Sequence, residues 1–387
     1  MARYLDACAT APPSPQVRQA MVEAQERAWA NPSSLHGPGL AAAESLERSR
    51  LRLEELLGCA AGELILCSGG SEAIHTALLG TAAALEPGRL VISAVEHPAT
   101  LAAAGTLRRS GWEIAVLPVD RRGLVRLAAL EHLLAPPTRL VSLIWGQSEV
   151  GSLQPLEAIG RRCRAAGVPL HVDAVQVVGH RPVAFADLPV DLLSCTAHKL
   201  QGPRGIGALL VRRGLELQPL IGGAQEGGRR GGTEPVVLAA GFAAALEQAV
   251  GRLAAGGRDP LASPRDALWE RLRGLEGVRL SGPDPSRAEE RLPHHLSLLL
   301  SAADGTPLPG RDMVRALWRE GYAVSSGSAC RSGAAAGASP VLLAMGCGQA
   351  EAGSGLRVSL GPWVSGEALE AFPAALERAR RRLAATG

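Results

Sequence analysis

The chain has 387 residues, of which 47% are hydrophobic and 20% charged, and its formal net charge is +3. This composition is typical of a globular protein with room for one large and one smaller domain, and it favours neither nucleic acid nor an acidic membrane as a partner. No apolar run approaches the roughly 20 residues that a membrane-spanning helix needs. The seven cysteines are scattered and form no CxxC pairs, which predicts neither disulfides nor a metal site and favours the reducing cytoplasm.

Short apolar runs alternate with helical patterns through the first two thirds of the chain. The apolar runs predict buried strands over 63–67, 90–93, 113–117, 139–145, 170–173, 191–195 and 205–211. The helical patterns between them include 71–85, 98–109 and 156–166. Continuous apolar strands joined by helices are typical of an open, mainly parallel α/β sheet, whose ligand sites gather at the carboxyl ends of the strands.

The sequence pattern changes after Thr233. A long helix is expected over 234–255, and it is followed by a turn rich in proline and glycine and then by mixed helices and strands. We therefore predict a large α/β domain over 15–255. Residues 1–14 and 256–387 are expected to form a smaller α+β domain.

Lysine occurs only once in the chain. Of the 40 basic residues, 39 are arginine and the remaining one is Lys199. A GC-rich genome explains the excess of arginine, but a guanidinium group stays protonated and cannot act as an amine nucleophile. A single lysine in such a chain is therefore a candidate for a Schiff-base residue.

Polar groups that suit a phosphorylated cofactor stand at strand ends. The run 67–72 carries two glycines between a strand and a helix, which is either an ordinary turn or an anion cradle. Asp173 ends an apolar strand, where an aspartate can pair with the pyridine nitrogen of pyridoxal phosphate. Lys199 follows 26 residues later, flanked by the possible phosphate donors Thr196 and His198. The spacing favours a pyridoxal site between Asp173 and Lys199.

Short motifs connect almost the whole chain to one family. They are 4–10 (YLDACAT), 31–36 (NPSSLH), 68–72 (SGGSE), 96–98 (EHP), 171–176 (HVDAVQ), 197–199 (AHK), 202–207 (GPRGIG), 222–226 (GGAQE), 230–233 (RGGT), 325–330 (SSGSAC) and 356–361 (LRVSLG). In these segments the chain resembles the cysteine desulfurases, fold-type I enzymes of the class V aminotransferase group that include the nitrogen-fixation and iron–sulfur desulfurases. The resemblance implies a pyridoxal-phosphate enzyme with a mainly parallel seven-stranded sheet in a large domain beside a smaller α+β domain.

Carried over position by position, the resemblance implies a role for each matching residue. Lys199 holds the cofactor as a Schiff base, Asp173 pairs with the pyridine nitrogen, and His97 stacks on the ring and moves protons. The remaining cofactor contacts are Gln176 and Ser148 near the ring hydroxyl, and Gly70, Ser71, Thr196, His198 and Thr233 at the phosphate. Thr233 would reach in from the second subunit of a homodimer. The substrate contacts are Arg357, whose fork binds the carboxylate, Ser148 and Asn31.

Cys330 lies in a loop of small residues and is followed by Arg331. A lone cysteine is more often a small buried side chain than a nucleophile, but this setting favours an exposed thiolate. With the resemblance, we predict that Cys330 is catalytic. It takes the sulfur of L-cysteine as a persulfide, L-alanine is released, and the sulfur passes to an acceptor protein or scaffold.

The chain departs from the family pattern at 147–151. The family usually has Asn-Asn-Glu-x-Gly there, whereas this chain has Gln147 and Ser148 in the first two positions. Two alternative functions stay open: a selenocysteine lyase or aminotransferase of the same fold, and a partner-dependent member of low activity that acts mainly as a binding protein. The sequence does not distinguish iron–sulfur cluster assembly, tRNA thiolation and DNA phosphorothioation as the destination of the sulfur.

Overall fold

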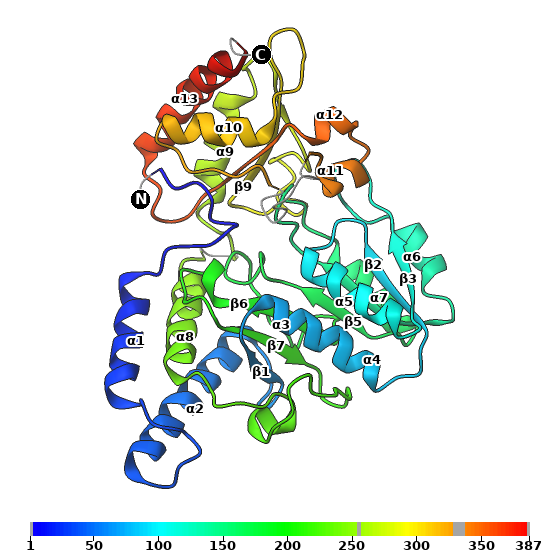
Figure 1. The fold of residues 1–387 in the computed structure, drawn as a ribbon, viewed down its shortest axis with the longest axis vertical. Helices are drawn as coiled ribbons and strands as arrows, with labels where there is room; N and C mark the ends of the chain where they lie inside the picture. The colour runs from blue at the N-terminus through cyan, green and yellow to red at the C-terminus, as the bar shows by residue number, and fades with distance from the viewer. Residues whose placement is uncertain (1–2, 254–256, 328–336, 385–387) are drawn as a thin grey trace.

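A seven-stranded sheet and a three-stranded sheet form the framework of the computed structural model, which describes residues 3–253, 257–327 and 337–384 (Figure 1). The large sheet consists of β1 (Leu64–Cys67), β2 (Arg89–Ser93), β3 (Glu113–Leu117), β4 (Thr138–Ile144), β5 (Leu170–Asp173), β6 (Leu192–Thr196) and β7 (Gly207–Val211). Their order is β1-β7-β6-β5-β4-β2-β3, and only β7 runs antiparallel to its neighbours. The predicted mainly parallel seven-stranded sheet is thus confirmed.

Helices surround this sheet, and its central strands are buried at every position. The helices are α1 (Pro15–Arg27), α2 (Gly37–Leu57), α3 (Gly70–His75), α4 (Thr81–Ala83), α5 (Pro98–Arg109), α6 (Leu127–Leu133), α7 (Leu156–Ala165) and α8 (Val236–Gly251). A π-helical turn, η1 (Thr76–Gly80), joins α3 to α4. In Figure 1, α1, α2 and α8 lie together beside the β1 side of the sheet, and α1 and α2 both pack on α8. Strands covered on both faces explain the continuous apolar runs of the sequence.

The smaller sheet lies in the upper part of Figure 1. It is antiparallel, in the order β10-β9-β8, and consists of β8 (Val278–Leu280), β9 (His295–Leu300) and β10 (Gly355–Ser359). The helices of this region are α9 (Ala262–Leu272), α10 (Gly310–Arg319), α11 (Pro340–Ala344), α12 (Gln349–Ala352) and α13 (Gly366–Ala384). Of these, α9, α10 and α13 enclose a second apolar core with Leu5 of the N-terminal segment, whereas α11 and α12 contribute Val341, Leu342 and Ala352 to the core of the large sheet. The division into domains at residue 255 stays a prediction.

The N-terminal segment connects the two sheets. Tyr4 and Asp6 form bridges with Ala323 and Ser359 near the small sheet. A few residues later, the backbone N–H of Ala11 donates to the carbonyl of His198, which follows β6 of the large sheet, at 2.8 Å. Residues between these two anchors therefore pass along the carboxyl ends of the large sheet's strands.

No helix among the described residues combines the length and the apolar character that crossing a membrane requires.

Gly207 allows β7 to lie unusually close to the turn that precedes α3. A Cβ atom at this position would stand 2.8 Å from the carbonyl carbon of Gly69 and 2.7 Å from the carbonyl oxygen of Cys195. Both neighbours are backbone atoms, so relief requires a shift of the strand or of the turn.

We expect Gly207→Ala to lower the free energy of unfolding by about 1–3 kcal/mol, because overpacking of a filled interior costs this much. Urea denaturation of the two proteins would measure the difference. Gly366→Ala in the first turn of α13 is the matched control, since its added methyl group meets no atom within 4 Å. Equal stability of the two variants would contradict the close approach at Gly207.

Candidate active site

Three titratable side chains meet at the carboxyl ends of the parallel strands. Asp173 is the last residue of β5, Lys199 ends the short helix η2 (Ala197–Lys199) after β6, and His97 precedes α5 after β2. Each of the three lies within electrostatic range of the other two. The structure thus brings together the lysine, the aspartate and the histidine that the sequence singled out.

The amine of Lys199 is held by the N-terminal segment. Its Nζ donates to the carbonyl oxygens of Cys8 and Ala9 at 2.6 and 2.7 Å. The side-chain amide of Gln176 donates to the same Cys8 carbonyl at 3.0 Å. Sequence reasoning gave Cys8 and Ala9 no role in the site, although both belong to the motif 4–10 that supported the resemblance.

Burial controls the protonation of this group of residues. Burial lowers the pKa of Lys199, and the positive charge of Arg357 lowers it further. Burial likewise raises the pKa of Asp173 and lowers that of His97, while the attraction between their charges opposes both shifts. His97 Nδ1 accepts from the backbone N–H of Ala99 at 3.1 Å, so a neutral His97 carries its proton on Nε2.

Of the residues predicted to hold phosphate, Gly70 and Ser71 begin α3, Thr196 ends β6 and His198 follows that strand. A Cβ atom on Gly70 would lie 2.9 Å from Val175 Cγ2 and 4.0 Å from Thr196 Cβ, so this glycine keeps the space open. Ser71 is exposed on the first turn of the helix. The Thr196 hydroxyl donates to the Ile206 carbonyl at 3.0 Å and keeps its acceptor capacity. His198 Nδ1 lies 3.1 Å from the hydroxyl of Thr10.

Arg357 is buried in β10 and faces two partners. Its Nη2 donates to Asp6 at 2.8 Å and its Nη1 to the backbone carbonyl of Ser148 at 3.1 Å. Its Nε is buried without a hydrogen-bond partner in the described structure. Sequence reasoning missed Asp6, although the residue belongs to the motif 4–10. The contact at Ser148 runs through the backbone, which any residue at this position could supply.

Asn31 and Thr233 stand apart from the Lys199 group within the chain. Both are exposed, and together with Trp29 and Pro235 they line a hollow of about 240 Å³ that no residue of the Lys199 group lines. A role at the cofactor therefore requires them to act from a second subunit.

Cys330 lies outside the described residues. The chain is described up to Gly327, and Ser325 exchanges two backbone hydrogen bonds with Arg357, at 2.7 and 3.2 Å. Among the described cysteines, all of which are free thiols, none is exposed. Burial raises the pKa of Cys59, Cys163 and Cys195 to about 12, so these thiols are poor nucleophiles at neutral pH.

Comparison with known proteins gives a consistent result. Residues 3–372 match the family described as aminotransferase class-V. A cysteine desulfurase of Cereibacter sphaeroides is 38% identical over 97% of this chain and 96% of its own length. The solved structure of a NifS-like protein is 31% identical, covers 99% of this chain and 100% of its own, and superposes with a TM-score of 0.87. A structure of SspA in complex with cysteine is 28% identical, with a TM-score of 0.79, over 94% of this chain and all of its own.

Glu96 is a buried carboxyl group immediately before His97. Its Oε1 accepts from the Ser93 hydroxyl at 2.5 Å and from the Ile144 N–H at 2.9 Å, whereas Oε2 has no partner in the described structure. Burial raises the pKa of Glu96 from 4.5 to about 8. The folded chain therefore keeps a proton on Glu96 at pH values where the unfolded chain has lost it.

Because folding takes up this proton between pH 4.5 and about 8, the free energy of unfolding should fall as the pH rises through that window. Glu96 should contribute up to about 1.4 kcal/mol per pH unit to this decrease, and we expect Glu96→Gln to remove that contribution. Denaturant unfolding at several pH values would measure it. Glu44→Gln on the exposed face of α2 should leave the slope unchanged. A wild-type slope in Glu96→Gln would show that Glu96 titrates normally.

Proposed function

We propose that Lys199 carries pyridoxal phosphate in this chain, which belongs to the class-V aminotransferase family and is a cysteine desulfurase of that family. Cys330 is the proposed sulfur-receiving residue. The observation that carries this proposal is the meeting of Lys199, Asp173 and His97 at one edge of the sheet. A cytoplasmic location also stays a prediction.

The residues around Lys199 fit pyridoxal phosphate. The buried carboxylate of Asp173 suits a protonated pyridine nitrogen, and a positive partner there would offset the cost of its burial. The glycine at position 70 leaves beside the start of α3 a space that a Cβ atom would fill. When bound, pyridoxal phosphate supplies a sink for the electrons of the bond broken at the substrate Cα.

Lys199 and His97 are the proposed proton carriers. A buried amine with a lowered pKa can be neutral, so Lys199 Nζ can accept the proton of the substrate Cα. The carbonyl groups of Cys8 and Ala9 orient this amine through hydrogen bonds. They are too weakly basic to take a proton from it. His97, with its proton on Nε2, can donate to an oxygen or a carbon that gains charge.

Arg357 is the proposed anchor of the substrate carboxylate. Its unpartnered Nε and the remaining hydrogens of its two Nη groups are donors available to an anion. The Ser148 carbonyl fixes one arm of the guanidinium, and Asp6 fixes the other. Because this support comes from a backbone carbonyl, the departure of Ser148 from the family asparagine is compatible with a competent substrate site.

The sulfur step uses Cys330 as nucleophile. Its thiolate attacks the sulfur of the substrate, the carbon–sulfur bond breaks, and a sulfur–sulfur bond forms on Cys330. The electrons of the broken bond stay with the substrate carbon, which takes up a proton and leaves as the methyl group of L-alanine. L-cysteine and the thiol thus give L-alanine and a persulfide, with no other oxidant or reductant. An acceptor protein or scaffold then removes the outer sulfur.

A homodimer would complete the site. Thr233 and Asn31 are exposed, and the loop that joins α1 to α2 carries Trp29 and Leu35, which are 67% and 91% exposed. Exposed apolar side chains that gather on one loop are typical of a protein interface. In such a dimer Thr233 would contact the cofactor phosphate of the partner subunit.

We expect the purified enzyme to form alanine from L-cysteine, and both Lys199→Ala and Cys330→Ala to lose at least about 100-fold in rate, as removal of a nucleophile or general base generally costs. Cys347→Ala, at a partly buried thiol outside the site, should keep the wild-type rate. Alanine would be quantified by chromatography. Full turnover of Cys330→Ala would contradict the persulfide step and favour an aminotransferase or a selenocysteine lyase.

Sedimentation velocity tests the homodimer. The wild-type chain should sediment as a dimer, and the double variant Trp29→Asp, Leu35→Asp should sediment as a monomer, because each substitution buries a charge in the proposed interface. Trp318→Asp on α10 is the control, since Trp318 is 68% exposed but lies in the other part of the molecule. A monomeric wild type, or a dimer that survives the double variant, would overturn the dimer.

A further inference from the structure

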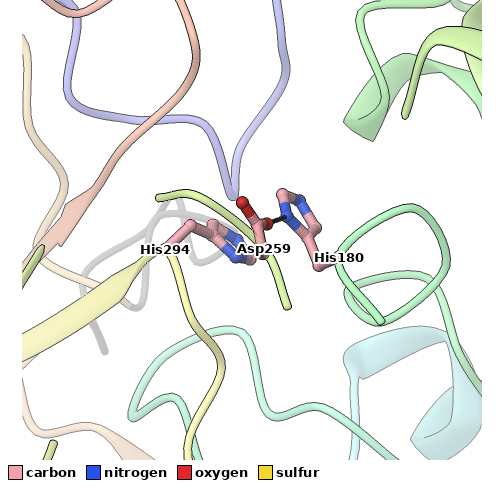
Figure 2. Close-up of side chains that lie close together, drawn as sticks. All are labelled: His180, Asp259 and His294. Carbon is pink, nitrogen blue, oxygen red and sulfur yellow. Dashed lines mark hydrogen bonds and ion pairs between the residues drawn. The ribbon is translucent and has the colours of Figure 1, made fainter. Parts of the chain in front are cut away.

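A cluster of metal-ligating side chains lies next to the N-terminal segment, outside the proposed catalytic groups. His180 follows β5, Asp259 precedes α9 and His294 precedes β9, and Figure 2 shows the Asp259 carboxylate directed at the imidazole ring of His180. One potential ligand atom from each of the three lies within 4.8 Å of the others. All three are at least nine-tenths buried.

Cys8 lies beside this cluster and can supply a fourth ligand once side chains move. Its sulfur lies 3.3 Å from Nε2 of His294, and its side chain is 2% exposed. On the opposite side of the cluster, Nδ1 of His180 and Oδ2 of Asp259 are 2.6 Å apart. The two imidazole rings are stacked, with centroids 3.7 Å apart and planes inclined by 15°.

Hydrogen bonding within the chain does not account for all of these polar groups. Nδ1 of His294 is buried and has no partner in the described structure. A buried polar group that remains unpaired costs free energy, so such groups are rare and need a reason. None of the four side chains has a part in the proposed sulfur chemistry, because the only contribution of Cys8 to that site is its backbone carbonyl.

We propose that His180, Asp259, His294 and Cys8 bind one divalent transition-metal ion of the zinc type. Two imidazoles, a carboxylate and a thiolate are a donor set that favours zinc-like ions over magnesium or calcium, which prefer oxygen ligands. The ligand atoms of a tetrahedral zinc site lie about 3.3 Å apart, as follows from bonds of about 2.0 Å. The ligand atoms of His180, Asp259 and His294 lie within 4.8 Å of one another, and His180 Nδ1 and Asp259 Oδ2 are 2.6 Å apart, so a bound ion would draw some of these atoms together and move others apart.

The charges around the cluster explain why the thiolate is part of the set. Arg252 and Arg265 lie within electrostatic range of Asp259. With one carboxylate alone, a divalent ion would leave a net positive charge beside two guanidinium groups. The Cys8 thiolate makes the site neutral, and a bound metal ion stabilises the deprotonated sulfur.

Metal binding requires a local rearrangement of the side chains. An ion between His180 and Asp259 replaces their hydrogen bond, and the stacked rings must turn so that their nitrogen lone pairs converge. The sequence predicts no metal site because its cysteines are scattered, whereas these ligands come from four separate segments of the chain.

The test is metal binding by the full-length enzyme after treatment with a chelator. We expect one equivalent of Zn²⁺ per chain after gel filtration, measured by mass spectrometry of the element. Co²⁺ should give the intense visible bands of a tetrahedral site, together with a thiolate-to-cobalt band. Loss of a residue that only hydrogen-bonds to a metal ligand weakens metal affinity roughly 10- to 100-fold. Asp259→Asn and His294→Gln each remove a ligand and should therefore weaken Zn²⁺ binding by more than this. Cys8→Ala should abolish the thiolate band.

Two controls separate this site from the catalytic cysteine and from loss of fold. Cys330→Ala and Cys347→Ala should both keep the full equivalent of metal. Zn²⁺ should raise the unfolding temperature of the wild type and of Cys330→Ala, but not that of Asp259→Asn, because only a bound ligand shifts the folding equilibrium. Undiminished binding by Asp259→Asn and His294→Gln, loss of binding in Cys330→Ala, or absence of bound metal in the wild type would each overturn the proposal.

Discussion

The amine of Lys199 points at two backbone carbonyl groups of the N-terminal segment, and the arrangement of the whole site depends on this contact. The segment is anchored to the small sheet through Tyr4 and Asp6 and to the large sheet through Ala11. It therefore fixes the position of the small sheet, which carries Arg357, relative to the lysine of the large sheet. Backbone carbonyl groups suit this task because they orient the amine and cannot themselves be protonated near neutral pH.

Burial of the groups around Lys199 also determines how the site can work, because it sets their protonation. Burial lowers the pKa values of Lys199 and His97 and raises those of Asp173 and Glu96, so each of these groups is driven towards its neutral form. Neutral amines and imidazoles are the forms that accept and relay protons. The charges of His97 and Lys199 lower the pKa of Asp173 and so oppose the effect of burial. A positively charged cofactor nitrogen would lower this pKa further. A cofactor with such a charge would therefore favour the ionised form of Asp173.

The parts of the structure that follow local rules could be predicted from the sequence. The bounds of β5 were predicted correctly, because its apolar run is short and ends at the polar Asp173. The proximity of Lys199 and Asp173 was also predicted, because adjacent parallel strands end at one edge of the sheet. The carbonyl groups that hold Lys199 have no signal in the sequence, since every residue has one. The cluster of His180, Asp259 and His294 was missed because its members are far apart in the chain and meet only in the folded state.

We propose that groups assembled around Lys199 transfer sulfur from L-cysteine to Cys330. The most direct measurement is the intact mass of the protein after anaerobic treatment with L-cysteine, followed by peptide mapping of the modified residue. We expect the added mass of one sulfur atom per chain, located on Cys330 and absent from Lys199→Ala. Sulfur on another cysteine of the wild type, or alanine formed without any added sulfur, would contradict it.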